Sequence, residues 1–413
     1  MALDFSNQAL RKAVRFDEIG IEKECLRITS DGRLSHTSHP FSEDDRNVSR
    51  DFCENQIEFV SDVFTDSFAL TEHMNRLHDK VYSKISENGE YLWSFSNPPF
   101  TDGEDDIPIA KFSQQNKGKE EYRNYLSKKY GKMKMLFSGI HYNFSFSDVL
   151  LGVCGQSKDE LYLDLAEKLI KYSWLIVYLT AASPLLDSSY ISNTALSEID
   201  RYRYASVRCG DAGYWNDFIP TLSYSSVESY ADSIQKYISS GLLKSSGELY
   251  YPIRLKPRGE NTLERLKNGV NHIELRMLDI NPFSRVGIMR EDVDFIHLLI
   301  LWLCSLDKAD LSDREQIRAI ENIKTAALYD DSNRIILDGE SICVRRAAKE
   351  TLDKIRDFAQ KYLPEFFEAL DFQYKKLGGN RYARLVRDRF GSDYLNLGLE
   401  LARQYAERGD PYV

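Results

Sequence analysis

FSGIHYNFSF (residues 137–146) and NHIELRMLD (271–279) both alternate apolar and polar side chains along the chain. Successive side chains of a strand point to opposite faces of a sheet, so each stretch predicts a strand with one apolar and one polar face. The residues on the polar faces are His141, Asn143 and Ser145 in the first stretch, and His272, Glu274 and Arg276 in the second.

Two earlier stretches, GIEKECLR (20–27) and DFCENQIEFV (51–60), repeat this alternation with acidic residues. A solvent-exposed sheet face would explain each stretch alone, because antiparallel sheets commonly face water on one side. The flanking residues, however, are too apolar for a freely exposed sheet; they are Phe52, Phe59, Phe144 and Leu275. If the polar faces line one concavity, six side chains converge there: Glu22, Glu24, Glu54, Glu58, His141 and Glu274.

Clustered carboxylates repel one another unless cations neutralise them. Mg²⁺ and Mn²⁺ are the natural partners, because hard divalent ions prefer oxygen ligands and commonly bind together with phosphate groups. Arg276 lies two positions after Glu274 and would point into the same site, where it could stabilise charge on a transferring phosphoryl group. The pattern alone leaves two interpretations open, a metal and nucleotide site or a structural sheet.

Helical periodicity is clearest in residues 66–88, where Asp66 is a candidate N-cap and Gly89 a candidate stop signal. Residues 159–182 and 291–306 are apolar almost all round and predict buried helices. Further helices are expected at 312–328, 345–376 and 392–407. We therefore predict one catalytic domain over residues 1–413, with a mixed sheet and helix core in 1–290 and a mainly helical part in 291–413.

Composition excludes several classes of function. The 413 residues carry 54 Lys and Arg against 64 Asp and Glu, a net charge of −10 that argues against nucleic acid as the main partner. No apolar run reaches the roughly 18 residues of a membrane span or forms a signal peptide, so we expect a cytoplasmic protein without a membrane partner. The six cysteines form no C-x-x-C pair and are expected to be reduced thiols. There is no P-loop or G-x-G-x-x-G motif, so any ATP binds in another way.

At these residues the sequence resembles a known family, the bacterial glutamate–cysteine ligases (γ-glutamylcysteine synthetases), including the ligase half of bifunctional glutathione synthases. The resemblance runs from about residue 15 to the C-terminus. The matching segments are GIEKECLRI (20–28), DFCENQIEFVS (51–61), YRNYLSKKYG (122–131), SGIHYNFS (138–145), VRCGDAGY (207–214), ELYYPIR (248–254), IELRMLDINPFSRVGI (273–288) and NRIILDG (333–339).

This resemblance implies an α+β fold with a curved antiparallel sheet of the glutamine synthetase or guanidino-kinase type. Its concave face would hold metal ions and ATP, with helices wrapped around it. The implied reaction joins the γ-carboxylate of glutamate to the amino group of cysteine through a γ-glutamyl phosphate, with ATP as co-substrate and Mg²⁺ or Mn²⁺ as cofactor. This is the first step of glutathione biosynthesis.

The resemblance also assigns roles to individual residues. Those matching the metal ligands are Glu22, Glu24, Asp51, Glu58, His141 and Glu274. Arg276 matches a nucleotide phosphate contact and, with Glu274, forms the implied catalytic pair. Arg123, Asn143 and Arg208 match positions near the amino-acid substrates. The implied pocket for the cysteine side chain consists of Phe52, Tyr122, Leu126, Tyr214 and Tyr250.

Two segments depart from the family pattern. WSFSNPPF (93–100) replaces a W-P-L-S-M-P type run, so Ser94 and Asn97 are expected to change a substrate-facing loop, and residues 255–270 are individual to this chain. A related small amino acid or another amine is therefore an alternative acceptor. Two other classes stay open: a silent binding protein on the same scaffold, and a phosphotransferase of the guanidino-kinase type. The sequence carries no signal for oligomeric state.

Overall fold

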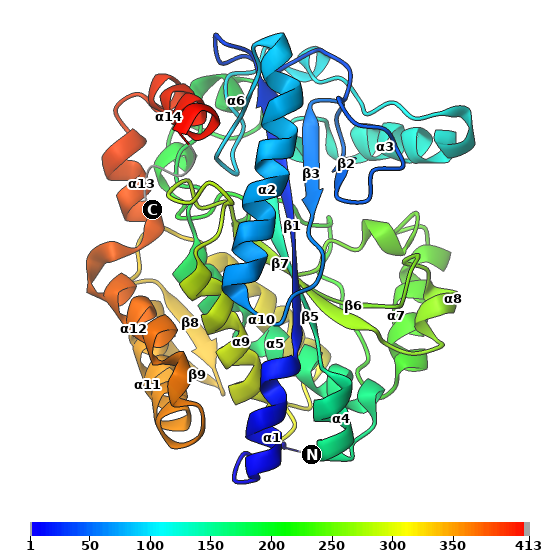
Figure 1. The fold of residues 1–413 in the computed structure, drawn as a ribbon, viewed down its shortest axis with the longest axis vertical. Helices are drawn as coiled ribbons and strands as arrows, with labels where there is room; N and C mark the ends of the chain where they lie inside the picture. The colour runs from blue at the N-terminus through cyan, green and yellow to red at the C-terminus, as the bar shows by residue number, and fades with distance from the viewer. Residues whose placement is uncertain (1, 409–413) are drawn as a thin grey trace.

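A seven-stranded antiparallel sheet forms the centre of the computed structural model, which describes residues 2–408 (Figure 1). Its order is β2-β3-β1-β5-β7-β6, with β4 paired to β1. The strands are β1 (Glu18–Ile28), β2 (Val48–Arg50), β3 (Gln56–Val60), β4 (Tyr91–Leu92), β5 (Gly139–Ser145), β6 (Ile253–Lys256) and β7 (His272–Asp279). The expected α+β class, with an antiparallel sheet wrapped by helices, is thereby confirmed.

The apolar face of the sheet packs against α2 (Ser67–Ile85) and α5 (Lys158–Thr180). It also contacts α9 (Arg290–Cys304) through Tyr142 and Phe144 of β5. α5 and α9 are buried over most of their length, as their apolar sequences predict. α2 begins where expected, because the Asp66 side chain accepts a hydrogen bond from the Ala69 backbone at 2.7 Å. Gly89 ends the following turn with a φ of 67°, which suits glycine. The core therefore lies on one side of the sheet and leaves the other side for polar residues.

The remaining helices surround this centre (Figure 1). They are α1 (Gln8–Ala13), α3 (Lys117–Tyr130), α4 (Asp148–Cys154), α6 (Ser188–Ser192), α7 (Val227–Ser239), α8 (Leu263–Leu266), α10 (Asp313–Ala326), α11 (Val344–Tyr362), α12 (Phe367–Lys375), α13 (Tyr382–Phe390) and α14 (Tyr394–Arg408). The helix expected at 345–376 is broken into α11 and α12 at Pro364, whose ring removes a backbone donor. After residue 290 the described chain is helical except for one hairpin, β8 (Arg334–Leu337) and β9 (Glu340–Cys343).

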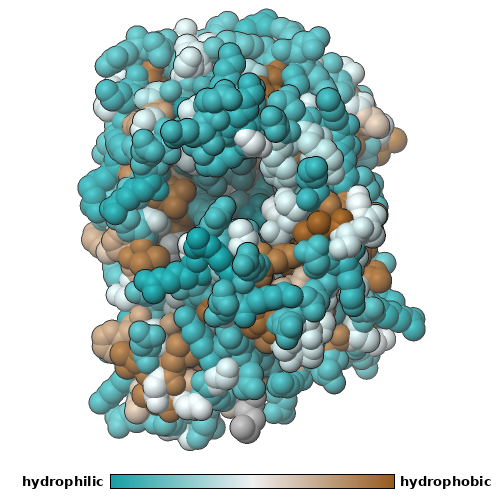
Figure 2. Space-filling view, turned by 90° about the vertical axis from the view of Figure 1, so that its right-hand side faces the viewer, coloured by the Kyte–Doolittle hydropathy of each residue, from teal (hydrophilic) through white to brown (hydrophobic). Residues whose placement is uncertain are grey.

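One side of the molecule is hollowed, and mostly hydrophilic residues surround the hollow (Figure 2). This is the side on which Figure 1 places α3 above and α7 and α8 below. Among the described residues, no helix combines the length and the apolar content needed to span a bilayer. All six cysteines lie within residues 2–408, and each is a free thiol there.

A buried ion pair fixes β1 to the segment that leads into β4. Arg27 Nη1 lies 2.7 Å from Glu90 Oε2, and the two side chains are 0% and 1% exposed. The hydroxyl of Ser35 donates to the other Glu90 oxygen at 2.6 Å, and Arg27 Nη2 donates to the Glu54 carbonyl at 2.9 Å. Both charges are thus compensated inside the protein, which is the condition under which a buried pair is tolerated.

We predict that Glu90→Gln lowers the free energy of unfolding by about 3–5 kcal/mol, because it leaves the Arg27 charge buried and uncompensated. Urea denaturation followed by circular dichroism measures this change. The matched control is Glu365→Gln, which removes the exposed pair with Arg15 and should cost less than about 1 kcal/mol. Equal losses in the two variants would contradict this interpretation.

Candidate active site on the polar face of the sheet

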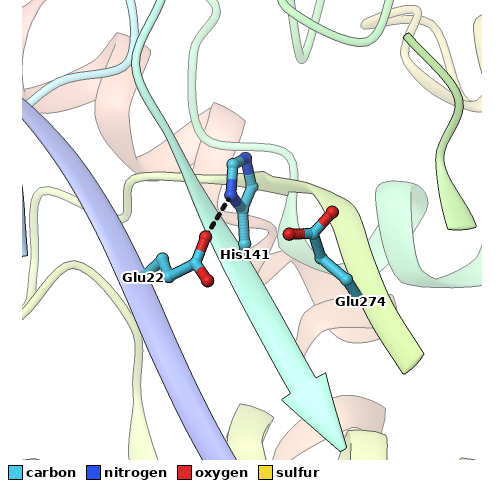
Figure 3. Close-up of side chains that lie close together, drawn as sticks. All are labelled: Glu22, His141 and Glu274. Carbon is cyan, nitrogen blue, oxygen red and sulfur yellow. Dashed lines mark hydrogen bonds and ion pairs between the residues drawn. The ribbon is translucent and has the colours of Figure 1, made fainter. Parts of the chain in front are cut away.

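The strand register brings the predicted acids onto one face of the sheet. Glu22 of β1 is paired with His141 of β5, and Glu24 of β1 with Glu58 of β3. Asn143 of β5 is paired with Glu274 of β7. Side chains directly opposite one another in an antiparallel pair share a face, so these residues face the same space. Figure 3 shows Glu22, His141 and Glu274 extending from three neighbouring strands.

His141 lies at the centre of this group. Its Nδ1 is 2.9 Å from Glu22 Oε2, and its Nε2 is 3.6 Å from Glu24 Oε1. Nε2 is buried and has no hydrogen-bond partner in the described structure. One ligand atom each from Glu22, His141 and Glu274 lies within 4.8 Å of the others. An unpartnered imidazole nitrogen among carboxylates fits a divalent cation, although the roles of these residues as ligands stay predictions.

The acids on the β1–β3 side are at least partly buried and repel one another. Burial, together with repulsion from Glu22 and Asp51, raises the pKa of Glu58 to about 8, although the Ser49 hydroxyl donates to it at 2.6 Å. Burial and the charge of Asp51 likewise raise the pKa of Glu24. The raised pKa values follow from burial and from repulsion among neighbouring carboxylates, which a divalent cation would offset. The family resemblance implied Asp51 as a further metal ligand, and its charge acts on both glutamates.

Glu274 occupies the opposite, cationic end of the cluster. Burial alone would raise its pKa, but the charges of Arg276 and Lys256 hold the pKa well below its ordinary range. Arg276 Nη1 lies 3.0 Å from Glu274 Oε2, and Lys256 Nζ lies 3.0 Å from Oε1. Sequence reasoning missed Lys256, although the apolar and basic residues of IRLK (253–256) alternate in the same way as the predicted strands.

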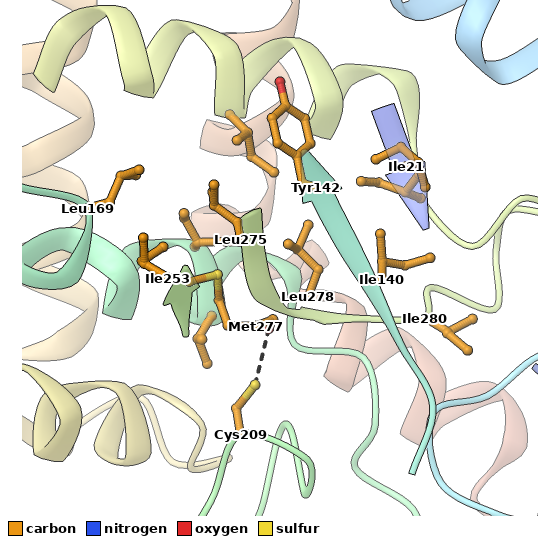
Figure 4. Close-up of a cluster of buried hydrophobic side chains, with 14 of the residues drawn as sticks. Ile21, Ile140, Tyr142, Leu169, Cys209, Ile253, Leu275, Met277, Leu278 and Ile280 are labelled. Atoms are coloured by element: carbon orange, nitrogen blue, oxygen red, sulfur yellow. Dashed lines mark hydrogen bonds between the residues drawn. The ribbon is translucent and has the colours of Figure 1, made fainter. Parts of the chain in front are cut away.

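A bulge in β7 adjusts the position of Arg276. Between the pairs Ile140–Leu278 and Tyr142–Leu275, β7 contains one residue more than β5. Arg276 donates its backbone N–H to Pro252 at 2.9 Å, and its Nη1 lies 3.4 Å from His141 Nδ1. The apolar side chains of these strands point to the reverse face, where Figure 4 shows Tyr142, Leu275 and Leu278 in the core.

Arg208 depends on a glycine of β5. Its Nη1 donates to the Arg276 carbonyl at 2.6 Å. A Cβ at Gly139 would lie 2.3 Å from the guanidinium carbon, so only glycine leaves room for this side chain. The Gly139 N–H also donates to Glu24 Oε2 at 2.8 Å. The structure thus places Arg208, a predicted substrate residue, beside the acidic cluster.

Arg123 holds α3 to the edge of the site. It donates to the backbone carbonyls of Asp51 and Arg50, and its guanidinium lies 4.6 Å from the centroid of the Phe112 ring. Burial lowers its pKa. Asn143 lies on the sheet itself and donates to Glu22 Oε1 at 3.2 Å. Both predicted substrate residues therefore border the acidic cluster.

The predicted acceptor pocket is partly assembled from aromatic rings. The rings of Tyr214 and Tyr250 lie 4.1 Å apart, and both line a cavity of about 30 Å³ together with Arg208 and Arg276. Burial, with the neighbouring hydroxyls of Tyr214 and Tyr122, raises the pKa of Tyr250, which brings Tyr122 into this group. The other two predicted pocket residues are also buried. Phe52 follows Asp51 in the chain, and Leu126 lies on α3, one turn after Tyr122.

One sequence expectation is wrong, and a second residue is buried in the structure. Glu54 does not join the cluster, because β3 begins only at Gln56 and the alternation fails in the turn before it. Its carboxylate accepts hydrogen bonds from the backbone N–H groups of His39 and Lys111, both at 2.8 Å. Asn97 is 1% exposed, and its amide donates to the carbonyls of Ser183 and Leu185. The Asn97 side chain therefore joins this loop to residues 183–185, and the effect of this departure on the substrate stays a prediction.

A sheet face with clustered acids at one end and cations at the other is typical of enzymes that bind phosphates through metal ions. The family model of glutamate-cysteine ligases matches residues 3–242 and 235–326. The glutamate–cysteine ligase of Clostridium acetobutylicum is 29% identical over 472 residues, covering 96% of this chain and 97% of that protein. The chain therefore belongs to the glutamate-cysteine ligase family.

The chain spans about half the length of the bifunctional relatives that it matches. The glutathione biosynthesis bifunctional protein GshAB of Listeria innocua is 38% identical over 383 residues, covering 87% of this chain and 49% of that protein. The glutamate–cysteine ligase of Francisella tularensis, solved with AMP, shares the fold with a TM-score of 0.87 at 24% identity over 96% of this chain and 89% of that one. The bifunctional glutathione synthetase of Pasteurella multocida gives 0.84 at 27% identity, with 97% and 54% covered.

We predict that Glu274→Gln weakens Mn²⁺ binding by at least about tenfold, because an uncharged amide replaces a buried anionic ligand. Isothermal titration with Mn²⁺ measures the affinity, and circular dichroism checks the fold. The control is Glu260→Gln, which alters an exposed acid and should bind Mn²⁺ as the parent protein does. Unchanged affinity in Glu274→Gln would remove this residue from the site.

Proposed function

We propose that this protein joins the γ-carboxylate of L-glutamate to the amino group of L-cysteine, using ATP and Mg²⁺, as the first step of glutathione biosynthesis. Family membership supports this activity. The single observation that carries it is the convergence of Glu22, His141, Glu274 and Arg276 on one polar sheet face, beside the arginines and tyrosines of the substrate region.

The chemistry requires activation of a carboxylate, which is a poor acyl donor. A γ-carboxylate oxygen of glutamate attacks the γ-phosphorus of ATP, and ADP leaves. The amino group of cysteine then attacks the acyl carbon of the γ-glutamyl phosphate, a proton leaves the nitrogen, and inorganic phosphate departs. Bound Mg²⁺ would offset the repulsion between the polyphosphate and the attacking carboxylate.

The residues proposed to hold Mg²⁺, or Mn²⁺, are Glu22, Glu24, Asp51, Glu58, His141 and Glu274. The unpartnered Nε2 of His141 and the raised pKa values of Glu24 and Glu58 support this set, because a divalent cation would satisfy the first and offset the repulsion behind the second. Glu274 also orients Arg276 at 3.0 Å, so that the guanidinium can neutralise charge on the phosphoryl group during transfer.

Substrate binding is assigned to the region between α3 and the sheet. Arg123 and Arg208 would pair with the carboxylates of the amino acids, because guanidinium groups offer bidentate geometry, and Asn143 would supply a polar contact. The proposed pocket for the cysteine side chain consists of Phe52, Tyr122, Leu126, Tyr214 and Tyr250. The cavity of about 30 Å³ beside Tyr214 and Tyr250 supports a small acceptor side chain.

We further infer that residues 1–413 act as one catalytic domain, with a sheet of the glutamine synthetase or guanidino-kinase type. The six free cysteines support a reducing location such as the cytoplasm.

Phosphate release tests the proposed function directly. The purified protein is incubated with ATP, Mg²⁺ and glutamate against a panel of amines, and the products are identified by mass spectrometry. The proposal predicts that release depends on both glutamate and cysteine, with γ-glutamylcysteine as the main product. Turnover with another amine and none with cysteine would reassign the acceptor, and no turnover with any amine would refute the ligase activity.

We predict that Arg276→Ala lowers kcat by about 10²–10³, the usual effect of removing one preorganised charge partner. Arg276→Lys is the matched variant; it keeps the charge but loses the planar fork, and should recover part of the rate. Thermal melting checks that both variants are folded. A change in kcat of less than threefold in Arg276→Ala would assign this residue to packing.

A further inference from the structure

Lys256 is the last residue of β6 and directly faces the polar side of β7. In the ladder Lys256 is paired with His272, and the next pair on the same face is that of Arg254 with Glu274. Its Nζ lies 3.0 Å from Glu274 Oε1, and its side chain is 18% exposed while that of Glu274 is 1% exposed. A single lysine ammonium therefore caps one oxygen of a buried carboxylate from the solvent side.

The two oxygens of Glu274 are thus each bound to a cationic side chain, Oε2 to Arg276 and Oε1 to Lys256. The same carboxylate belongs to the group of Glu22, His141 and Glu274 whose ligand atoms lie within 4.8 Å. A divalent cation on Glu274 would stand a few ångströms from either positive group, and like charges at that separation repel strongly. A cation bound to either oxygen therefore competes with the cationic side chain that this oxygen already binds.

Lys256 is the side chain able to leave. Arg276 is held at several points, by its backbone N–H to Pro252, by Glu274 and by the 3.4 Å contact with His141. The only contact of the Lys256 ammonium within hydrogen-bond distance in the described structure is Glu274. A lysine side chain is a flexible four-carbon stem with a compact, strongly hydrated charge, so the ammonium can reorient once a divalent cation replaces it on Glu274.

A space for the displaced ammonium exists on the same face. A cavity of about 780 Å³ extends past Glu22 and Asn143, and His272, the ladder partner of Lys256, lines it. The cavity is lined by two cations, Lys158 and Arg258, and by the acids Glu18 and Asp148. Lys256 lies beside it through its ladder partner His272. These three cations could pair with the oxygens of a nucleotide polyphosphate whose metal ions face the acids of the lining.

We propose that Lys256 is an exchangeable cation: it neutralises Glu274 in the free protein and moves to the phosphate oxygens of the nucleotide when a divalent cation binds Glu274. Lys256 thereby competes with metal in the absence of nucleotide and aids nucleotide binding in the presence of metal. The nucleotide half of this inference rests on the proposed function, whereas the metal half does not.

Lys256→Met tests the proposal, because methionine keeps the length of the stem and removes the charge. Mn²⁺ binding without nucleotide is followed by electron paramagnetic resonance and should strengthen about fivefold, the size expected from removing one unit charge a few ångströms away. Binding of ADP in saturating Mn²⁺, followed by calorimetry, should weaken about tenfold, because a charge-assisted hydrogen bond is lost.

The matched control is Lys267→Met in the same segment, which removes an exposed lysine paired with Asp232 at 2.7 Å. It should change neither affinity. Unchanged or weaker Mn²⁺ binding in Lys256→Met would overturn the metal half, and unchanged ADP binding would overturn the nucleotide half. If Lys256→Met does not fold, Lys256→Gln is measured in the same way. Both readouts are binding constants, so a failure of ligase activity in the amine panel is distinguishable from a failure of this proposal.

Discussion

Electrostatic repulsion within the polar face of the sheet is the constraint on which the site depends. The register places Glu24 directly opposite Glu58, and like charges opposite one another destabilise a sheet. Two features offset this repulsion: the pKa of Glu58 is raised to about 8, and Glu274 lies between Arg276 and Lys256. A divalent cation bound at this face would offset the same repulsion, and the repulsion therefore favours metal binding.

Burial of apolar side chains on the reverse face of the sheet offsets the repulsion among the acids. The reverse face of the same strands packs against α2, α5 and α9, where Tyr142 and Leu275 are fully buried. Burial of apolar surface is the dominant favourable contribution to folding, and here it is separated from the site by the thickness of one sheet. Loops and α3 then bring Arg123, Arg208 and the tyrosines to the margin, with Gly139 leaving the room that Arg208 needs. Stability and chemistry thus reside on opposite faces of one element.

Much of this could be predicted from local patterns. Period-two alternation located β1, β5 and β7 and assigned Glu22, His141 and Glu274 to a shared face, because side-chain direction in a strand follows from sequence position. Alternation does not show where a strand ends. It therefore predicts Glu54 on the polar face, although Glu54 precedes β3 and its carboxylate binds the backbone of His39 and Lys111. The contact of Arg208 with Gly139 and the pairing of Lys256 with Glu274 join residues distant in sequence, and only the register of the folded sheet brings them together.

The central claim is that the polar face binds divalent cations between β1, β5 and β7. Anomalous diffraction from crystals soaked in Mn²⁺ and a non-hydrolysable ATP analogue measures this most directly. The account predicts a manganese peak in contact with Glu22, His141 and Glu274, with the Lys256 ammonium displaced from Glu274 towards the phosphates. Manganese peaks found only elsewhere, with Lys256 still bound to Glu274, would contradict it.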